Sequence, residues 1–415
     1  MKLFQRLLVA PAALGLMAPL AANADISPVS SESDLSSEII QARVDGVEAQ
    51  LGEVMAGQFS SSTKMSGKAA FITGYVDDDA ETDTDEITME YMYQLNLNTS
   101  FTGEDNLYTR IKTGNVSDHF KDKGQNTYLS AANGNGGTLK VDKLWYQFPV
   151  GDSLQVWVGP RIENYYMLAS APSIYRPITK QFALGGNGSA YGSSTSPGFG
   201  AAWTQQVEDP MDPRFALSIN YTAKDGASSS KGFGDQSRDF LLTKVEYGSP
   251  TWQVSLAAAY KDGIDGKNGY DGYYHSSLAS SASGEMSAYG LRAYWRPDST
   301  GGAVPSVQIG YDTASFDEAT AGQAEDTAGW MIGLGWKDLF MDGNSAGFAI
   351  GSEMAATNIK GGGDDPSEDN SVWEAYYTFK VNDGVSVTPA IFGSTDVSGA
   401  DKDVTGAVLL TEFRF

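Results

Sequence analysis

The sequence contains no cysteine, which excludes a disulfide framework, a thiol nucleophile and a thiolate metal site. Histidine is almost as scarce, because only His119 and His275 could supply an imidazole. The sequence also lacks a Gly-x-Ser-x-Gly nucleophile motif. We therefore expect no metal site, no cofactor and no enzymatic activity. A membrane-barrel enzyme stays open as an alternative, because a Ser-His-Asp group can assemble from distant segments.

Long apolar runs are missing beyond residue 24. Residues 1–24 are typical of a secretory signal peptide, with charges at Lys2 and Arg6, an apolar region from Leu7 to Leu20 and a small-x-small cleavage site at Ala22-Asn23-Ala24. No later apolar run approaches the roughly 20 residues that a membrane-spanning helix needs. Because helices and closed β-barrels are the only structures that cross a bilayer, membrane insertion of this chain would require a barrel.

Basic residues are in deficit, with 28 Lys and Arg against 52 Asp and Glu and a formal net charge of −24. Nucleic-acid binding needs a basic surface, so nucleic acid is not an expected partner. The acidity leaves two interpretations open, namely repulsion between molecules in solution and attraction of cations towards a pore mouth.

From Gly67 onward, polar and apolar residues alternate with a period of two, interrupted by tight turns such as Val150-Gly151-Asp152. Long and short connections alternate along the chain, as they do in outer-membrane barrels. We therefore predict an all-β fold in which residues 59–415 form a 16-stranded antiparallel transmembrane barrel. The expected strands are 67–76, 87–101, 105–114, 138–149, 153–161, 197–205, 213–223, 237–248, 250–261, 284–297, 303–313, 327–338, 344–356, 371–381, 384–395 and 404–415.

The two faces of these strands differ in polarity. A barrel turns its apolar face to lipid and its charged face to a water-filled lumen, whereas a soluble sandwich does the reverse. The alternation alone leaves both open, but all eight tryptophans fall inside expected strands, which favours the barrel. The expected lumen-wall residues are Arg110, Lys112, Lys244, Arg292 and Arg296. The tryptophans expected in a girdle near the periplasmic surface are Trp145, Trp203, Trp252, Trp295 and Trp336.

The last nine residues form an amphipathic strand that ends on an aromatic residue. Chain ends of soluble proteins are normally polar, so this ending argues against a secreted β-sandwich adhesin. It resembles the terminal strand of outer-membrane barrels, which implies that Phe413 and Phe415 serve as an assembly signal.

Ahead of the barrel, residues 25–37 are polar and are expected to form a flexible linker. In residues 38–58, apolar residues recur at alternating steps of four and three, which predicts a short coiled-coil helix. It becomes stable if a trimer holds three copies together, and the alternative is one amphipathic helix lying on its own domain. The seam residues are Ile40, Val44, Val47, Leu51 and Val54.

The third long connection, residues 162–196, is rich in Ser, Gly, Tyr and Pro and is basic in an acidic chain. Loops of this length are usually functional or disordered. We expect it to fold into the barrel and to set what passes, because rings of Lys and Arg favour anions and acidic rings favour cations. Alternatively, some of these residues brace the loop against the wall. The constriction candidates are Arg161, Glu163, Tyr165, Tyr166, Tyr175, Arg176 and Lys180.

Two other outer connections are acidic. The first, residues 77–86, is expected to be a solvated, repelling loop, with binding of divalent cations or lipopolysaccharide as the alternative. The fifth, with Asp-Gly and Asn-Gly pairs from Asp262 to Gly272, predicts serial turns, with calcium binding as the alternative.

Four segments in order resemble the cyanobacterial outer-membrane porins of the OprB type, the carbohydrate-selective class. They are the signal peptide, ARVDGVEAQLGEVMAGQFSSSTKMSGKAAFITG from Ala42, LNTSFTGEDNLYTRIKTGN from Leu97 and VGPRIENYYMLASAPSIY from Val158. The resemblance implies a trimeric porin whose third long loop folds inward. The family usually carries an S-layer homology domain before the coiled coil. The short segment 25–37 leaves no room for it, so tethering to peptidoglycan is not expected.

Together these features predict an outer-membrane porin that lets small hydrophilic solutes and inorganic ions diffuse through a water-filled channel. A carbohydrate-selective channel is the alternative. The expected partners are outer-membrane lipid and lipopolysaccharide, two further copies of the chain in a homotrimer, and the solutes, with the coiled coil in the periplasm.

Overall fold

The structure is a computed structural model that describes residues 62–78, 86–186, 188–192, 195–234, 237–264, 284–363, 370–397 and 401–415. The chain divides into two units, residues 1–58 and 59–415, and every described residue belongs to the second. The expected signal peptide, linker and coiled coil therefore lie outside the described residues.

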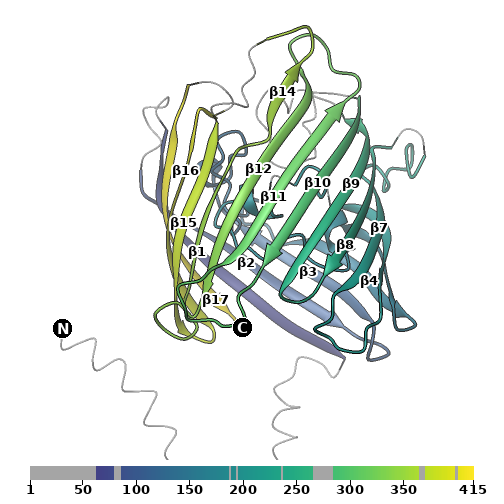
Figure 1. Ribbon diagram of the computed structural model, residues 1–415, viewed down its shortest axis with the longest axis horizontal. Coiled ribbons are helices and arrows are strands. Elements are labelled where there is room, and N and C mark those ends of the chain that lie inside the picture. The colour runs from purple at the N-terminus through teal and green to yellow at the C-terminus, as the bar shows by residue number, and fades with distance from the viewer. Residues whose placement is uncertain are drawn as a thin grey trace, which may run out of the picture. The chain divides into compact units, whose positions relative to one another are not determined.

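Within the described residues, seventeen strands form a single antiparallel sheet (Figure 1). The sheet closes because the last strand, β17, pairs with the first, β1, so that Ile72 lies opposite Leu410. The strands are β1 Thr63–Asp78, β2 Thr88–Thr99, β3 Asn106–Gly114, β4 Lys140–Val150, β5 Leu154–Ile162, β6 Ser196–Thr204, β7 Arg214–Ala223, β8 Asp239–Gly248, β9 Trp252–Ile264, β10 Gly284–Trp295, β11 Ser306–Phe316, β12 Ala324–Lys337, β13 Ser345–Gly351, β14 Ala355–Ile359, β15 Ser371–Asn382, β16 Val385–Thr395 and β17 Val404–Arg414.

Two of these strands share one position in the wall. β13 pairs with β12 and β15, and β14 continues along β12 after a break at 352–354. In Figure 1, β14 lies beside the upper end of β12. The barrel therefore has sixteen wall positions, and the predicted 16-stranded antiparallel barrel is confirmed. The expected strand 344–356 is the one that the structure divides.

Short turns join the strands at one end of the barrel. At the turn between β4 and β5, Gly151 has a φ of 62°, a left-handed conformation that glycine adopts without the steric cost of a Cβ. Among the described residues, no helix is long and apolar enough to cross a membrane. In the part of the chain that the structure describes, three single-turn 3-10 helices lie in the long connections, namely η1 Asp118–Phe120, η2 Asn164–Tyr166 and η3 Lys180–Phe182.

The alternation of side chains sorts them between lipid and lumen. On β10, Tyr289 and Leu291 are 51% and 48% exposed, whereas Arg292, on the opposite face of the strand, is 2% exposed. Exposed aliphatic and aromatic side chains on successive strands form the apolar outer surface that a bilayer requires.

The tryptophan girdle was predicted only in part. Trp203 and Trp295 are 42% and 45% exposed on the outer surface. Trp145 is 5% exposed and instead packs on the lumen side against Tyr108 and Tyr166. The prediction for Trp145 is wrong because a register shift between β3 and β4 leaves an extra residue, Asp142, in β4. Val141 before the shift is 46% exposed, whereas Lys143 and Trp145 after it are buried on the lumen side.

Candidate functional site

The third outer loop, residues 163–195 between β5 and β6, crosses the lumen to the opposite wall. Near its start, the Ala169 amide donates a hydrogen bond of 2.9 Å to Ser218 on β7. Farther along, the Ile174 amide donates a bond of 3.0 Å to Gln308 on β11. The Thr179 amide then reaches Glu374 on β15. These contacts place the loop inside the barrel, where it narrows the space available to a solute.

Glu374 is the far anchor of the loop. It is fully buried and accepts hydrogen bonds from the Tyr175 hydroxyl at 3.0 Å and the Ile178 amide at 2.9 Å. The amide and hydroxyl of Thr179 donate two more, at 2.8 and 2.7 Å. A buried carboxylate needs such donors, since an unbonded buried charge is strongly unfavourable. Glu374 therefore fixes the position of residues 175–179.

Basic side chains of the wall hold the middle of the loop by its carbonyl oxygens. Lys244 on β8 donates to the Ser170 carbonyl at 3.0 Å, and Lys261 on β9 donates to that of Ser189 at 2.6 Å. Arg292 on β10 donates to the Leu184 carbonyl at 2.7 Å and pairs with Asp312. Lys244 and Arg292, two expected lumen-wall residues, thus face inward but are buried beneath the loop.

The loop lies against the wall where the wall has no side chain. A Cβ placed on Gly310 of β11 would come within 1.6 Å of the Gly185 carbonyl oxygen. Gly185 itself has a φ of 72°. Only glycine at position 310 permits this approach of two backbones.

The second outer loop, residues 115–139 between β3 and β4, also enters the barrel. Its Val116, Phe120 and Leu129 are buried against inward-facing wall residues in a cluster that includes Ile72. This loop was not predicted from the sequence to enter the barrel. The available signal was the presence of large apolar residues, Val116, Phe120 and Leu129, in a long loop that would otherwise be polar. The two loops are joined by hydrogen bonds from Ser130 to Ile178 at 2.7 Å and from Lys180 to Tyr128 at 2.8 Å.

Where the third outer loop leaves β5, charged groups pair with one another. Arg110 on β3 forms an ion pair with Asp142 on β4 and donates a hydrogen bond of 3.1 Å to the Tyr166 hydroxyl. Lys143 forms an ion pair of 2.9 Å with Glu163. These bonds fix the root of the loop.

Three basic side chains of the site have no carboxylate partner among the described residues. Within the described residues, Lys112, Arg176 and Lys180 form no ion pair. Arg176 is exposed, and Lys112 and Lys180 are partly exposed. The Lys180 ammonium lies 3.8 Å from the ring centre of Tyr128, a cation–π contact. Burial lowers the pKa of Lys180 to about 8, although Glu163 nearby raises it.

Aromatic rings form a row at the root of the loop, where Tyr166 contacts Arg110 and Lys143. The ring centroids of Tyr108 and Trp145 are 4.3 Å apart, those of Trp145 and Tyr166 are 4.8 Å apart, and those of Tyr166 and Tyr165 are 4.7 Å apart. No aromatic track was expected from the sequence, because its members come from three separate segments.

The remaining candidates take different places. Tyr175 is 6% exposed, so it packs within the loop anchor. Arg161 is exposed, and its Nε donates to the Asp142 carbonyl at 3.4 Å. Arg296 is exposed and donates to the Pro250 carbonyl at 3.0 Å, next to the short turn between β8 and β9. The described residues contain no group of three His, Cys, Asp or Glu side chains that could hold a metal ion.

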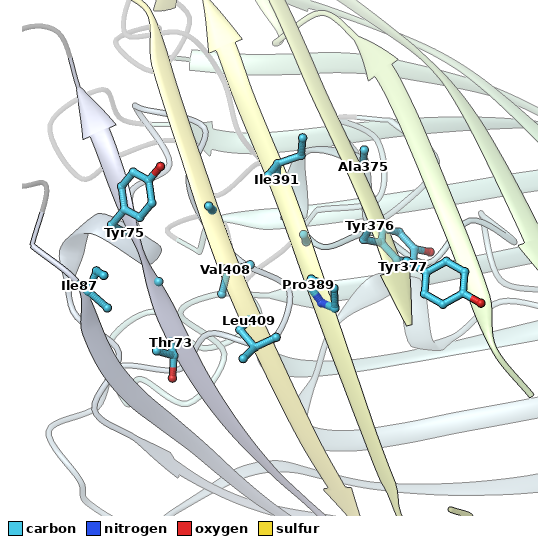
Figure 2. A pocket seen from close by; sticks show the side chains of 13 residues that line it. Thr73, Tyr75, Ile87, Ala375, Tyr376, Tyr377, Pro389, Ile391, Val408 and Leu409 are labelled. Carbon is cyan, nitrogen blue, oxygen red and sulfur yellow. The ribbon is translucent and has the colours of Figure 1, made fainter. Parts of the chain in front are cut away.

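A separate groove of about 620 Å³ lies on the outer face of β1, β15, β16 and β17 (Figure 2). Its lining includes Tyr75, Ile391 and Leu409, which are 38%, 51% and 45% exposed. These side chains point away from the lumen, so the groove is not part of the solute path.

Comparisons with known proteins point to one family. A family model described as "Carbohydrate-selective porin, OprB family" matches residues 31–392. The chain is 27% identical to an uncharacterized protein of Nostoc sp. over 92% of this chain and 71% of that protein. It is 24% identical to an uncharacterized protein of Synechocystis sp., over 92% of this chain and 74% of that protein. Among solved structures, the high-pH structure of Pseudomonas putida OprB matches with a TM-score of 0.59 and 14% identity, covering 85% of this chain and 94% of that chain. At this identity the structural match shows the fold alone.

Proposed function

The chain belongs to the OprB family of carbohydrate-selective porins, and on this premise we propose that the third outer loop sets which solutes its channel admits. The family membership agrees with the resemblance found in the sequence, and the protein is an outer-membrane porin. It forms a water-filled channel through which small hydrophilic solutes and inorganic ions diffuse passively.

The observation that carries the proposal is the path of the third outer loop across the lumen from β5 to β15. A solute must pass between this loop and the wall that the loop leaves uncovered. Lys112 stands on that wall, and Arg176 and Lys180 stand on the loop. The solute therefore meets charged groups at the narrow part of the path, where charge governs selection.

Planar-bilayer recording of the purified protein tests the proposal. We expect discrete conductance steps, and we expect shortening of the third outer loop between Ser170 and Gly185 to enlarge them. Steps of unchanged size in that variant, with the barrel still folded, would show that the loop does not limit the flow.

A carbohydrate channel is the second candidate, and the partly exposed rings of Tyr108, Tyr165 and Tyr166 favour it, with buried Trp145 packed between Tyr108 and Tyr166. Sugar rings stack their apolar faces on aromatic side chains, so a row of rings suits a sugar path. Swelling of liposomes in isotonic glucose or maltose measures this activity. Replacement of Tyr108 and Tyr165 by Ser should slow swelling with sugars and leave ion conductance in place.

We propose further that the porin is a homotrimer and that residues 38–58 form a three-stranded coiled coil in the periplasm. The heptad spacing of Ile40, Val44, Val47, Leu51 and Val54 supports this assembly. Contact with outer-membrane lipid and lipopolysaccharide follows from the localisation. Analytical ultracentrifugation of the detergent-solubilised protein should give three copies, and removal of residues 25–58 should weaken the assembly.

A further inference from the structure

Lys112 on β3 and Lys180 on the third outer loop bring two positive charges together inside the barrel. The second outer loop contacts both residues, because the Asn135 side chain donates a hydrogen bond of 3.3 Å to the Lys112 carbonyl and the Lys180 amide donates one of 2.8 Å to the Tyr128 carbonyl. The two ammonium groups and Arg110 are close enough to act on one another electrostatically. The loop and the wall meet here although like charges repel one another. A negatively charged solute between them would remove this repulsion.

The carboxylates nearby are already paired with other cations. Asp142 pairs with Arg110, and Glu163 pairs with Lys143 at 2.9 Å. Glu412 on β17 pairs with Lys68 at 2.7 Å. No carboxylate of the described residues lies within ion-pair distance of Lys112 or Lys180, so this part of the site carries excess positive charge.

The inward-facing carboxylates farther round the described part of the wall are bonded to other groups. Glu374 accepts hydrogen bonds from the third outer loop, Glu90 from Ser117 and Glu353 from Asn126. Three more form ion pairs, namely Glu246 with Lys244, Asp312 with Arg292 and Asp78 with Lys402. None of these carboxylates lies within ion-pair distance of Lys112 or Lys180.

We propose that Lys112 and Lys180 form a binding station for small inorganic anions, with chloride and phosphate as representatives, at the narrow part of the channel. The proposal rests on the proposed channel function and adds a substrate class to it. A lysine ammonium binds phosphate as a compact point charge, and rings of basic side chains make pores anion-selective.

The acidic outer loops do not cancel this preference. Charges exposed to electrolyte are screened over a Debye length of about 8 Å at physiological ionic strength, whereas partly buried charges are screened much less. Lys112 and Lys180 are partly buried and stand beside the path. They act on an ion at the step where it must leave part of its hydration shell.

Reversal potentials in a KCl gradient, measured on single channels of the full chain, test the proposal. The wild-type channel should prefer chloride over potassium. A Lys112→Gln/Lys180→Gln variant should lower the chloride-to-potassium permeability ratio by about threefold or more. Phosphate added at millimolar concentration should reduce the chloride current of the wild type and leave that of the variant unchanged.

A matched variant, Lys231→Gln/Lys360→Gln, removes the same charge from exposed outer loops, where these lysines are 44% and 48% exposed. It should keep the wild-type ratio, and heat-modifiable gel mobility should confirm that every variant is folded. Absence of conductance steps in the wild type would refute the channel itself. Conductance steps with no chloride preference, or with the same ratio in the lumen variant, would leave the channel in place and overturn the anion station.

Discussion

Glu374 on β15 accepts two hydrogen bonds from Thr179, one from its backbone amide at 2.8 Å and one from its hydroxyl at 2.7 Å. This contact joins the wall to the part of the third outer loop farthest from its own strands. Lys180, the next residue, is one of the two cations of the proposed anion station. The position of the station thus depends on a carboxylate that faces no solute.

The Glu374→Gln variant should therefore loosen the constriction. Hydrogen bonds to a charged group contribute about 1.5–3 kcal/mol each. The Gln side chain would place an NH2 group, which is itself a donor, next to the N–H and O–H donors of the loop, so some of these hydrogen bonds would be lost. Single-channel recordings should show larger or less steady conductance steps. Glu325→Gln, which removes a carboxylate that pairs with exposed Lys360, is the control. Traces identical to the wild type would mean that other contacts suffice to hold the loop.

Gly310 offers a way to move the loop without removing a charge. In Gly310→Ala, the new methyl group would have to displace the backbone at Gly185, and the loop should shift away from β11. We expect a changed conductance and faster proteolytic cleavage within residues 170–190. In the control Gly335→Ala, the methyl group would meet only the Ser306 hydroxyl at 3.1 Å. Wild-type conductance in Gly310→Ala would argue against close packing of loop and wall.

The preference for anions should fall as pH rises from 7 to 9. The pKa of Lys180 is about 8, so its amine is mostly protonated below that pH and mostly neutral above it. Lys180 is therefore protonated in about nine tenths of the molecules at pH 7 and in about one tenth at pH 9. Tyr128 stays neutral here, because burial raises its pKa. The other charged groups facing Lys180 are Lys123 on the second outer loop, Arg110 and Lys112 on β3, Lys143 on β4 and Glu163.

Reversal potentials at three pH values measure this change. The Lys180→Gln variant is the control, because its dependence on pH should be flatter than that of the wild type. Equal slopes in the two proteins would assign the titration to another group.

Arginines that differ in burial should differ in effect. Arg176 is exposed on the third outer loop, so Arg176→Gln should lower the chloride preference and leave the folded barrel unchanged. Arg292 is 2% exposed and pairs with Asp312, so Arg292→Gln should lower the melting temperature by leaving a buried carboxylate unpaired. Reversal potentials and thermal unfolding in detergent measure the two effects. A larger selectivity change from Arg292→Gln would contradict the assignment.

The barrel could be predicted from the sequence because strand alternation and turn residues are local signals. β2, for example, was expected at 87–101 and spans Thr88–Thr99. The division of 344–356 into β13 and β14 could not be predicted, because residues 352–354 interrupt the ladder without a proline or a pair of glycines. Trp145 was misplaced because a register shift moves side chains between faces without changing the composition of the strand.

The site was less predictable, because its contacts join residues far apart in the chain. The third outer loop was recognised by its length, yet its anchor Glu374 lies about two hundred residues farther on, in a different strand. Period-two alternation alone would have put Glu374 on the lumen side together with Val372. Only the fold shows that Glu374 binds the loop, that the loop covers Lys244 and Arg292, and that Lys112 has no ion-pair partner among the described residues.

The end of the chain forms the seam of the barrel, and its loss should impair closure. Phe415 and Gly67 exchange backbone hydrogen bonds of 2.6 and 3.2 Å, and the ring centre of Phe413 is 5.1 Å from that of Phe71. Phe415→Ser should lower the amount of heat-modifiable barrel in outer membranes, whereas Phe415→Tyr, which keeps an aromatic end, should retain it. Refolding into detergent micelles separates two causes. A Ser variant that refolds normally in detergent but is lost from cells has lost an assembly signal, because the seam itself is intact. Equal membrane levels of the Ser variant and the wild type would show that Phe415 serves neither purpose.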